Sequence, residues 1–438
     1  MKKIIGVFIL FICACILLSS CDSASIIKPV DSLLSPPLYH EEYEALVDAF
    51  RENVSKDGVL CTPQDGDHRS AIIVEDIDSD GETEALVFYK DGVESAVAKM
   101  HYFNTVDGRW KSRGDYNGYG NEVKKVVVSD MDGDGKYELV VIWSVSGVST
   151  SNVMSVYRTE HDADEYKEIS NEICTVCEVA DVDGDSKEEI FYMNQVTVSE
   201  QSQRYAKIMK IDGGSVEYIG EAKLDPNISS YISVKTEKAS GDSPFRFYID
   251  ALKGENQMIT ELVYWDDEKS ELCAPLLNTD EMINKDTLRD IPVASADVNN
   301  DGIIDIPVQA EVLTDSVDSG YIMKWFNYSN GVKHTVATTF VNYTYGYMVQ
   351  LNEDESVRYL VSQNSWVVSK INSADQSSYD LYSVVFKSSE NNGGSNELNS
   401  GIPIIEKENG VICAFISQSG ANMGIDEEQV NKIITKIP

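Results

Sequence analysis

Four acidic segments share one spacing of residues that could hold a metal ion. Each has Asp or Asn at positions 1, 3 and 5, Gly or Ser at position 6, and Asp or Glu at position 9. The residues at these positions are Asp76, Asp78, Asp80, Gly81 and Glu84; Asp130, Asp132, Asp134, Gly135 and Glu138; Asp181, Asp183, Asp185, Ser186 and Glu189; and Asp297, Asn299, Asp301, Gly302 and Asp305. Repetition within one chain argues against a chance pattern.

The chemistry that this spacing favours is calcium binding. Ca²⁺ takes about six to eight oxygen ligands in flexible geometry, and carboxylates at alternate positions of a tight loop can converge on it. Gly at position 6 allows the positive φ of a sharp turn. The backbone carbonyl at position 7 is expected to add a ligand, from Glu82, Lys136, Lys187 and Ile303. A polar turn without an ion would hold these acids in mutual repulsion, so we expect three or four calcium ions.

Position 12 separates these loops from the EF-hand, which needs a bidentate Glu there and a helix on each side. Position 12 is occupied here by Val87, Val141, Tyr192 and Val308. Short runs of β-branched and aromatic residues follow each loop, and similar runs precede the first two, as strands do. Each loop is therefore predicted to join one strand to the next.

An acidic DxDxDGxxE loop between two strands resembles the FG-GAP or VCBS calcium repeat of β-propellers, including the head of integrin α-subunits. The resemblance implies that each repeat is one four-stranded blade whose calcium loop links the two inner strands. The literal Phe-Gly and Gly-Ala-Pro signatures are absent. The third loop has Ser186 in place of Gly, and the fourth uses Asn299 and Asp305, so we expect these two sites to be weaker.

The spacing of the loops agrees with blades. Their first Asp residues lie 54 (130 − 76), 51 (181 − 130) and 116 (297 − 181) residues apart, and a propeller unit takes about 40 to 50 residues. The long gap predicts a copy without calcium, in which strands around 247–249 and 259–265 flank a loop that keeps one acid, Asp250. The fold class expected is all-β, a β-propeller over residues 65–390 with about seven blades, six to eight being allowed.

The N-terminal region has the layout of a bacterial lipoprotein signal. Lys2 and Lys3 precede an apolar run over 4–18 that is too short to span a bilayer, and Leu18-Ser-Ser-Cys21 resembles a lipobox. We expect a signal peptide over 1–20, a lipid on Cys21 and a tether over 21–38. Cys21 would then attach the chain to the outer face of the cytoplasmic membrane, or to the outer membrane of a Gram-negative cell. An ordinary secretory signal with an incidental Cys is the alternative.

Two further segments are expected beside the blades. Apolar residues at helical spacing predict an amphipathic helix within 39–60, over Glu41 to Val54, that packs on the propeller. Residues 401–438 are predicted to form a hairpin around Asn409-Gly410 and a last helix with Val430, Ile433, Ile434 and Ile437 on one side. They would close the propeller or form a cap.

The remaining composition limits the function. The formal net charge is −37, which argues against nucleic acid as a partner. Cys174 and Cys177 form a CxxC, but its apolar setting favours buried core thiols over a redox or zinc site. The sequence has no catalytic serine elbow, HExxH motif or phosphate-binding loop.

We therefore expect a membrane-anchored binding protein without catalysis, whose propeller recognises a protein or a glycan. Two alternatives are a calcium-dependent hydrolase or lyase of an extracellular polysaccharide, and a structural envelope protein stabilised by calcium.

Overall fold

The computed structural model describes residues 41–438 apart from 146, 160–164, 199–200, 239–243, 314–319, 330, 352–356, 363–364, 373–374, 376 and 390–400. The predicted signal peptide, the lipidated Cys21 and the tether lie outside the described residues. Within the described part, no helix combines the length and apolar character that crossing a membrane requires.

The described strands form six antiparallel sheets that follow one another along the chain. The first three sheets consist of β1 (Val59–Leu60), β2 (Ile72–Glu75), β3 (Glu84–Lys90), β4 (Lys99–Val106) and β5 (Arg109–Asn117); β6 (Glu122–Ser129), β7 (Glu138–Val145), β8 (Val148–Thr159) and β9 (Tyr166–Cys174); and β10 (Val176–Ala180), β11 (Glu189–Val198), β12 (Gln201–Asp212) and β13 (Ser215–Leu224). The second and third sheets are simple meanders, and in the first sheet both β1 and β2 pair with β3.

The last three sheets depart progressively from this plan. They consist of β14 (Ile228–Glu237), β15 (Arg246–Lys253), β16 (Gln257–Asp266) and β17 (Glu271–Cys273); β18 (Ile306–Leu313), β19 (Gly320–Ser329), β20 (Val332–Asn342), β21 (Tyr347–Gln350) and β27 (Ile434–Lys436); and β22 (Val357–Ser362), β23 (Ser365–Ile371), β24 (Ser378–Ser388), β26 (Gly410–Ile416) and β25 (Ile402–Lys407). The fourth sheet is again a meander, whereas the C-terminal region adds β27 to the fifth sheet and the hairpin of β25 and β26 to the sixth.

The strand that follows the acidic loop, such as β3 or β7, is apolar on both faces because both faces are covered. Sheets lie on both sides of β7, whereas β3 lies between the second sheet and the helix at residues 41–53. All but the last residue of β3 and of β7 is buried. The outermost strand β5, by contrast, is exposed or half-buried along its length. Sheets buried on both faces read as continuous apolar runs rather than alternating ones, which explains the runs at 85–89 and 139–143.

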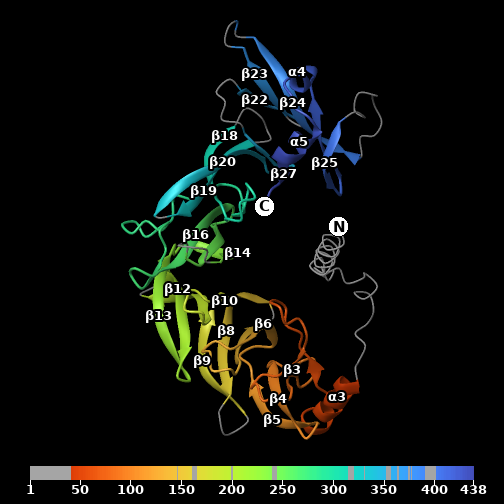
Figure 1. The fold of residues 1–438 in the computed structure, drawn as a ribbon, viewed down its shortest axis with the longest axis vertical. Coiled ribbons are helices and arrows are strands. Elements are labelled where there is room, and N and C mark those ends of the chain that lie inside the picture. Colours follow the sequence, from red (N-terminus) through yellow and green to blue (C-terminus); the bar gives the residue numbers. More distant parts are fainter. Residues whose placement is uncertain are drawn as a thin grey trace, which may run out of the picture.

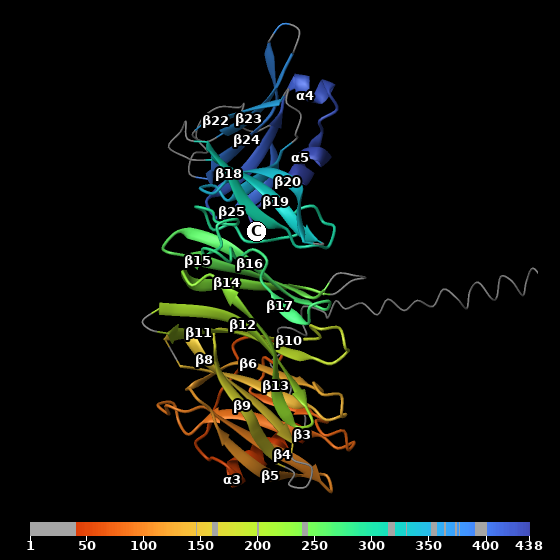
Figure 2. The same ribbon diagram turned by 90° about the vertical axis from the view of Figure 1, so that its left-hand side faces the viewer.

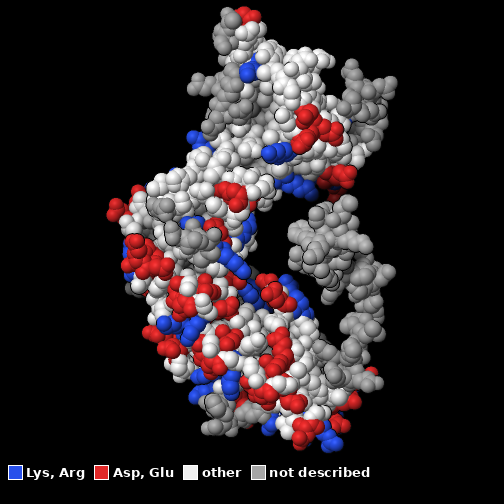
Figure 3. All heavy atoms as spheres, viewed as in Figure 1, with Lys and Arg blue, Asp and Glu red and all other residues white. Residues whose placement is uncertain are grey.

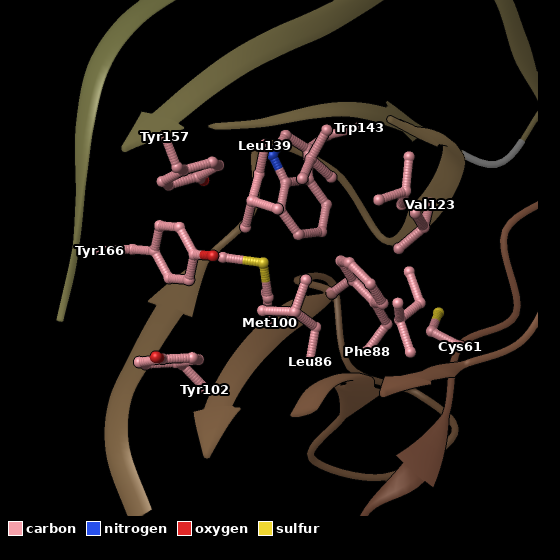
Figure 4. Packing of buried hydrophobic residues seen from close by; sticks show 14 of the residues in the cluster. Cys61, Leu86, Phe88, Met100, Tyr102, Val123, Leu139, Trp143, Tyr157 and Tyr166 are labelled. Carbon is pink, nitrogen blue, oxygen red and sulfur yellow. The ribbon is translucent and has the colours of Figure 1, made fainter. Parts of the chain in front are cut away.

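Large side chains fill the space between successive sheets. Between the first two sheets, Leu86, Phe88 and Met100 face Leu139 and Trp143 (Figure 4). Tyr102 and Tyr166 make an edge-to-face contact with ring centroids 4.9 Å apart. A comparable apolar cluster joins each later pair of neighbouring sheets, so each sheet is stabilised mainly by the sheets next to it.

The six sheets lie along an open arc rather than a closed ring (Figure 1). The first strands β6, β10 and β14 lie toward the concave side, and the last strands β5, β9 and β13 toward the convex side. The perpendicular view shows the same succession along the long axis (Figure 2). The sequence predicts about seven blades, with six to eight allowed, and the described residues form six sheets.

The helix expected over 41–54 is α3 (Glu41–Asn53). It packs on the first sheet through Leu46 and Phe50, which are buried against β3, and the Phe50 and Tyr89 ring centroids are 5.0 Å apart. Its apolar stripe therefore serves a packing role, as the sequence indicates.

The C-terminal region differs from the prediction in its last residues. The hairpin around Asn409-Gly410 is present as β25 and β26, and it extends the sixth sheet beside β24. The helices α4 (Gln418–Asn422) and α5 (Glu427–Ile433) follow. The predicted helix ends at Ile433, because residues 434–436 instead form β27 and pair with β21. Ile434 is buried through this sheet contact.

The blade without calcium also differs from the prediction. The strands expected around 247–249 and 259–265 exist as β15 and β16, but they are the second and third strands of the fourth sheet. Asp250 lies within β15 and is fully buried, not in a loop. The acid therefore belongs to the interior of this sheet, and its partners are described below.

Candidate metal centres

The first three acidic segments connect the two strands expected. They link β2 to β3, β6 to β7, and β10 to β11, and the linked strands pair in each case. The fourth segment lies just before β18, and a single antiparallel bridge between Ala296 and Asp305 joins its two ends. It therefore lacks the preceding strand that anchors the other three loops.

A repeated set of hydrogen bonds shapes all four loops. The carboxylate at position 1 accepts from the backbone N–H at position 6, as between Asp76 and Gly81 at 3.1 Å and between Asp130 and Gly135 at 3.0 Å. The side chain at position 3 accepts from the N–H at position 5, and the carboxylate at position 5 accepts from the N–H at position 7. The same bonds recur in the third and fourth loops.

Position 6 adopts the left-handed conformation that the sequence predicts. The φ of Gly81 is +93° and that of Gly135 is +87°, whereas Ser186 is held at +73° in the third loop. A side chain there is strained relative to glycine by about 1–2 kcal/mol. Position 4 is left-handed as well, a feature that the sequence analysis missed although Gly133 and Gly184 occupy it in two loops.

The carboxylate at position 9 is buried, and in the first three loops only one of its two oxygens has a hydrogen-bond partner among the described residues. Glu84, Glu138 and Glu189 are at most 1 % exposed. One oxygen of each accepts from the backbone N–H at position 2, at 2.7, 3.0 and 2.8 Å respectively. The other oxygen, Oε1, has no hydrogen-bond partner among the described residues. A buried acceptor left without a partner is costly, so these oxygens are suited to a ligand.

In the first three loops, positions 1, 3 and 9 converge. One carboxylate oxygen from each member of a triad lies within 4.8 Å of the others, in the sets Asp76, Asp78 and Glu84; Asp130, Asp132 and Glu138; and Asp181, Asp183 and Glu189. Each of these triads could hold a metal ion. The acids at position 5, Asp80, Asp134 and Asp185, lie outside the triads.

Burial and neighbouring acids oppose ionisation of the carboxylate at position 9. Burial, with a smaller contribution from the acids at positions 3 and 5, raises the pKa of Glu84, Glu138 and Glu189 to about 7. The pKa of Asp305 is raised to about 6, again mainly by burial. A divalent cation between the acids would favour their charged forms.

The four loops differ in how many buried oxygens remain unpaired. In the first two, Asp76 and Asp130 also have an Oδ1 without a partner among the described residues. In the third, Oδ1 of Asp181 accepts from the Gly184 N–H at 2.8 Å. In the fourth, Oδ1 of Asp297 accepts from the Asp301 N–H at 3.1 Å, and only Asp305 keeps an unpaired oxygen. The first two loops are therefore the most complete candidate sites.

Neighbouring loops also contact one another. The backbone N–H of Tyr137 donates to the carbonyl of Ile77 at 2.8 Å, and the Ser79 hydroxyl donates to the carbonyl of Gly135. Between the second and third loops, the Ser129 hydroxyl donates to Glu188. The second loop is further contacted by Arg158, whose guanidinium lies 3.0 Å from Asp134.

An apolar residue at position 2 fixes each loop to the core, which the sequence analysis also missed. Ile77, Met131 and Val182 are at most 3 % exposed and pack between neighbouring sheets. Val298 has the same place in the fourth loop. The signal was visible as an apolar residue between the first two acids of every segment.

The fourth sheet holds its buried acids in another way. Asp250 is fully buried and accepts from Thr260, Ser233 and the backbone and side chain of Ser295, and it forms an ion pair with the buried Arg289 at 3.3 Å. Asp225 pairs with Lys253 at 2.6 Å. Glu261 accepts from Asn284 and from the Asp225 N–H. No oxygen of these three described acids is left unpaired.

The comparisons with known proteins place the chain in no family. No family model matches the sequence, and no curated protein matches it. A solved structure with some similarity is the rhamnogalacturonan lyase PL11 of Bacillus licheniformis, with a TM-score of 0.30, 10 % identity, and coverage of 74 % of this chain and 83 % of that one. A similarity at this level carries no argument about the activity of this chain.

Proposed function

We propose that this chain is a calcium-binding lipoprotein of the bacterial envelope whose FG-GAP- or VCBS-like sheets form a binding scaffold. The observation that carries the proposal is the repeated, buried and unpaired carboxylate oxygen at position 9 of the acidic loops. The proposal assigns no reaction to the chain.

Calcium is the ion that suits these donors best. The side chains that converge in the first three loops are all carboxylates. Hard cations such as Ca²⁺ prefer oxygen ligands of this kind. The carbonyls of Glu82, Lys136, Lys187 and Ile303 are proposed to complete the shells, with the acid at position 5. Mg²⁺ is less suited because it demands near-octahedral geometry and retains water.

The blade assignment is supported by topology as well as by the loops. In each of the first three sheets, an acidic loop joins two paired neighbouring strands: β2 and β3, β6 and β7, and β10 and β11. This is the arrangement that the repeat family implies. The arc is open in Figure 1. Propeller-type blades set side by side, rather than a sealed ring, are therefore the form that we propose.

The ligand and the location are proposed on the same basis. A lipid on Cys21 would hold the scaffold outside the cytoplasmic membrane, where calcium is available. The acids are numerous over the sheets that carry the loops (Figure 3), which favours cations and disfavours nucleic acid and anionic lipid. A glycan or a protein is the class of ligand that remains.

Calcium titration of residues 22–438 by calorimetry, with thermal melts in calcium and in chelator, tests the proposal. We expect three or four bound ions and a lower melting temperature in chelator, since a ligand at 100 times its Kd stabilises by about 2.7 kcal/mol per site. Asp80→Ala and Asp134→Ala should each lower both the stoichiometry and the stability. If either variant loses stability while binding as much calcium, its loop is not a metal site.

A further inference from the structure

A hollow on the concave side of the arc has the character of a binding site. Its volume is about 450 Å³, which lies within the range of small-molecule sites. It is bounded by β6, β10 and β14, the first strands of three successive sheets, and by the starts of β8 and β12. The hollow lies at the opposite end of β6 from the acidic loop: Lys124 precedes Asp130 by six residues, or about 20 Å of strand. It is therefore separate from the candidate metal centres.

Two buried donor atoms in this hollow have no hydrogen-bond partner in the part of the chain that the structure describes. Asn152 is 3 % exposed and Arg204 is 9 % exposed. Neither Nδ2 of Asn152 nor Nε of Arg204 has a hydrogen-bond partner among the described residues, although another guanidinium nitrogen of Arg204 donates to the carbonyl of Ile228. Buried donors normally have a hydrogen-bond acceptor. An acceptor on a bound ligand would supply the missing hydrogen bonds to Asn152 and Arg204.

The charge of the hollow is opposite to that of the chain. The residues around it include Lys124, Lys125 and Arg204 against two acids, Asp65 and Glu178. Both acids are already paired, Glu178 with Lys125 at 2.6 Å and Asp65 with Arg69 at 3.3 Å. Lys and Arg side chains lie along the concave edge near β6 and β14 (Figure 3). In a chain with a net charge of −37, this local excess of cations favours an anion.

The remaining walls suit a ring that carries hydroxyl groups. The Arg204 guanidinium lies 5.7 Å from the centre of the Tyr231 ring, and Ile232 beside it is 52 % exposed. The lining also includes Ile142, Cys174 and Cys177. Burial raises the pKa of Cys174 to about 12, so this thiol is neutral and does not repel an anion. A sugar presents both an apolar face and polar edges, and it would use both kinds of wall.

We propose that this hollow binds an acidic sugar, whose carboxylate accepts from Asn152 and Arg204 and whose ring packs against Tyr231 and Ile232. The inference deepens the proposed function by naming a ligand class, and it rests on that function for the choice of a glycan. The site uses no acid of the calcium loops, so the two can fail separately.

The test is calorimetric titration of the full chain, in detergent and saturating calcium, with sodium glucuronate, glucose and sodium acetate. We expect glucuronate to bind more tightly than either of the others. Asn152→Asp, which exchanges the amide donor for a negative acceptor of the same size, should weaken glucuronate binding about tenfold or more.

Lys124→Glu, a change at a half-buried position with a lower risk to folding, should also weaken binding. Its matched control is Lys111→Glu on the exposed strand β5, which should leave binding unchanged. Absence of glucuronate binding, equal affinity for acetate, or full affinity in both hollow variants would each overturn the inference. Calcium binding measured on the same samples reports separately on the proposed function.

Discussion

The first three sheets and the fourth sheet bury carboxylates by different means. In the first three, the Glu at position 9 is buried beside two further acids, and one of its oxygens has no hydrogen-bond partner among the described residues. In the fourth, Asp225 and Asp250 are buried just as deeply, but Lys253 and Arg289 lie beside them. The fourth sheet therefore compensates its buried acids with Lys and Arg side chains of the chain itself. The first three sheets leave room for an external cation.

The difference predicts which regions respond to calcium. A buried charge without a partner costs several kcal/mol, and this cost is offset in the fourth sheet by groups that are always present. In the first three sheets, the compensating cation must come from the surrounding solution, so the compensation depends on the calcium concentration. The stability of the fourth sheet should therefore be less sensitive to a chelator than that of the first three sheets.

The largest effect is expected from Arg289→Met, which keeps the bulk of the side chain but removes the buried cation of Asp250 and leaves only Lys235, 4.0 Å away. Burial lowers the pKa of Arg289 to about 10, so the wild-type side chain is charged at neutral pH. Removal of one partner of a buried pair costs about 3–5 kcal/mol. Chemical denaturation should show this loss equally in calcium and in chelator.

The matched control is Arg69→Met, which removes an exposed ion pair with Asp65 and should cost about 0–1 kcal/mol. If Arg289→Met lowers stability only in chelator, the proposed contrast between the fourth sheet and the first three is wrong.

An intermediate effect is expected from Asp130→Asn in the second loop, compared with Asp297→Asn in the fourth. Within the described residues, Oδ1 of Asp130 has no hydrogen-bond partner, whereas both carboxylate oxygens of Asp297 accept a hydrogen bond. In calcium at about 100 times Kd, Asp130→Asn should remove one bound ion and about 2.7 kcal/mol of stability. Asp297→Asn should change both less, and calorimetry with parallel denaturation measures the two quantities. Equal losses for the two variants would contradict the ranking of the loops.

The smallest effect is expected from Ser186→Gly in the third loop. The left-handed conformation of Ser186 is relieved by glycine, although glycine also loses more backbone entropy on folding. We expect a net gain of about 0.5–1 kcal/mol and tighter calcium binding at this loop. The reciprocal change, Gly135→Ser in the second loop, should have the opposite sign in the same denaturation assay. A loss of stability in Ser186→Gly would show that φ is not what limits the third site.

Much of the local structure follows from the sequence because it depends on neighbouring residues. The strands around the acidic loops, the hairpin at 402–416 and the helix over 41–53 all carry their signal in residue types and spacing. The left-handed turn at position 6 follows from glycine. The convergence of positions 1, 3 and 9 follows from the loop itself.

The remaining structure depends on contacts that spacing does not encode. Asp250 looks like the remnant of a loop until Arg289 and Ser295, some forty residues further on, are seen beside it. The donors Asn152 and Arg204 lie on different sheets and meet only through the packing of those sheets. The open arc depends on how whole sheets pack against one another, so no single segment of the sequence predicts it.

The pairing of β27 with β21 bears on the order in which the molecule assembles. Each of the first four sheets is made from one continuous stretch of chain, so it can form as soon as that stretch emerges. The fifth sheet must wait for residues 434–436, and until then β21 presents an unpaired edge of the kind that invites aggregation. While the chain emerges, the first three sheets would thus be complete before the fifth, whose edge at β21 is covered only when β27 pairs with it.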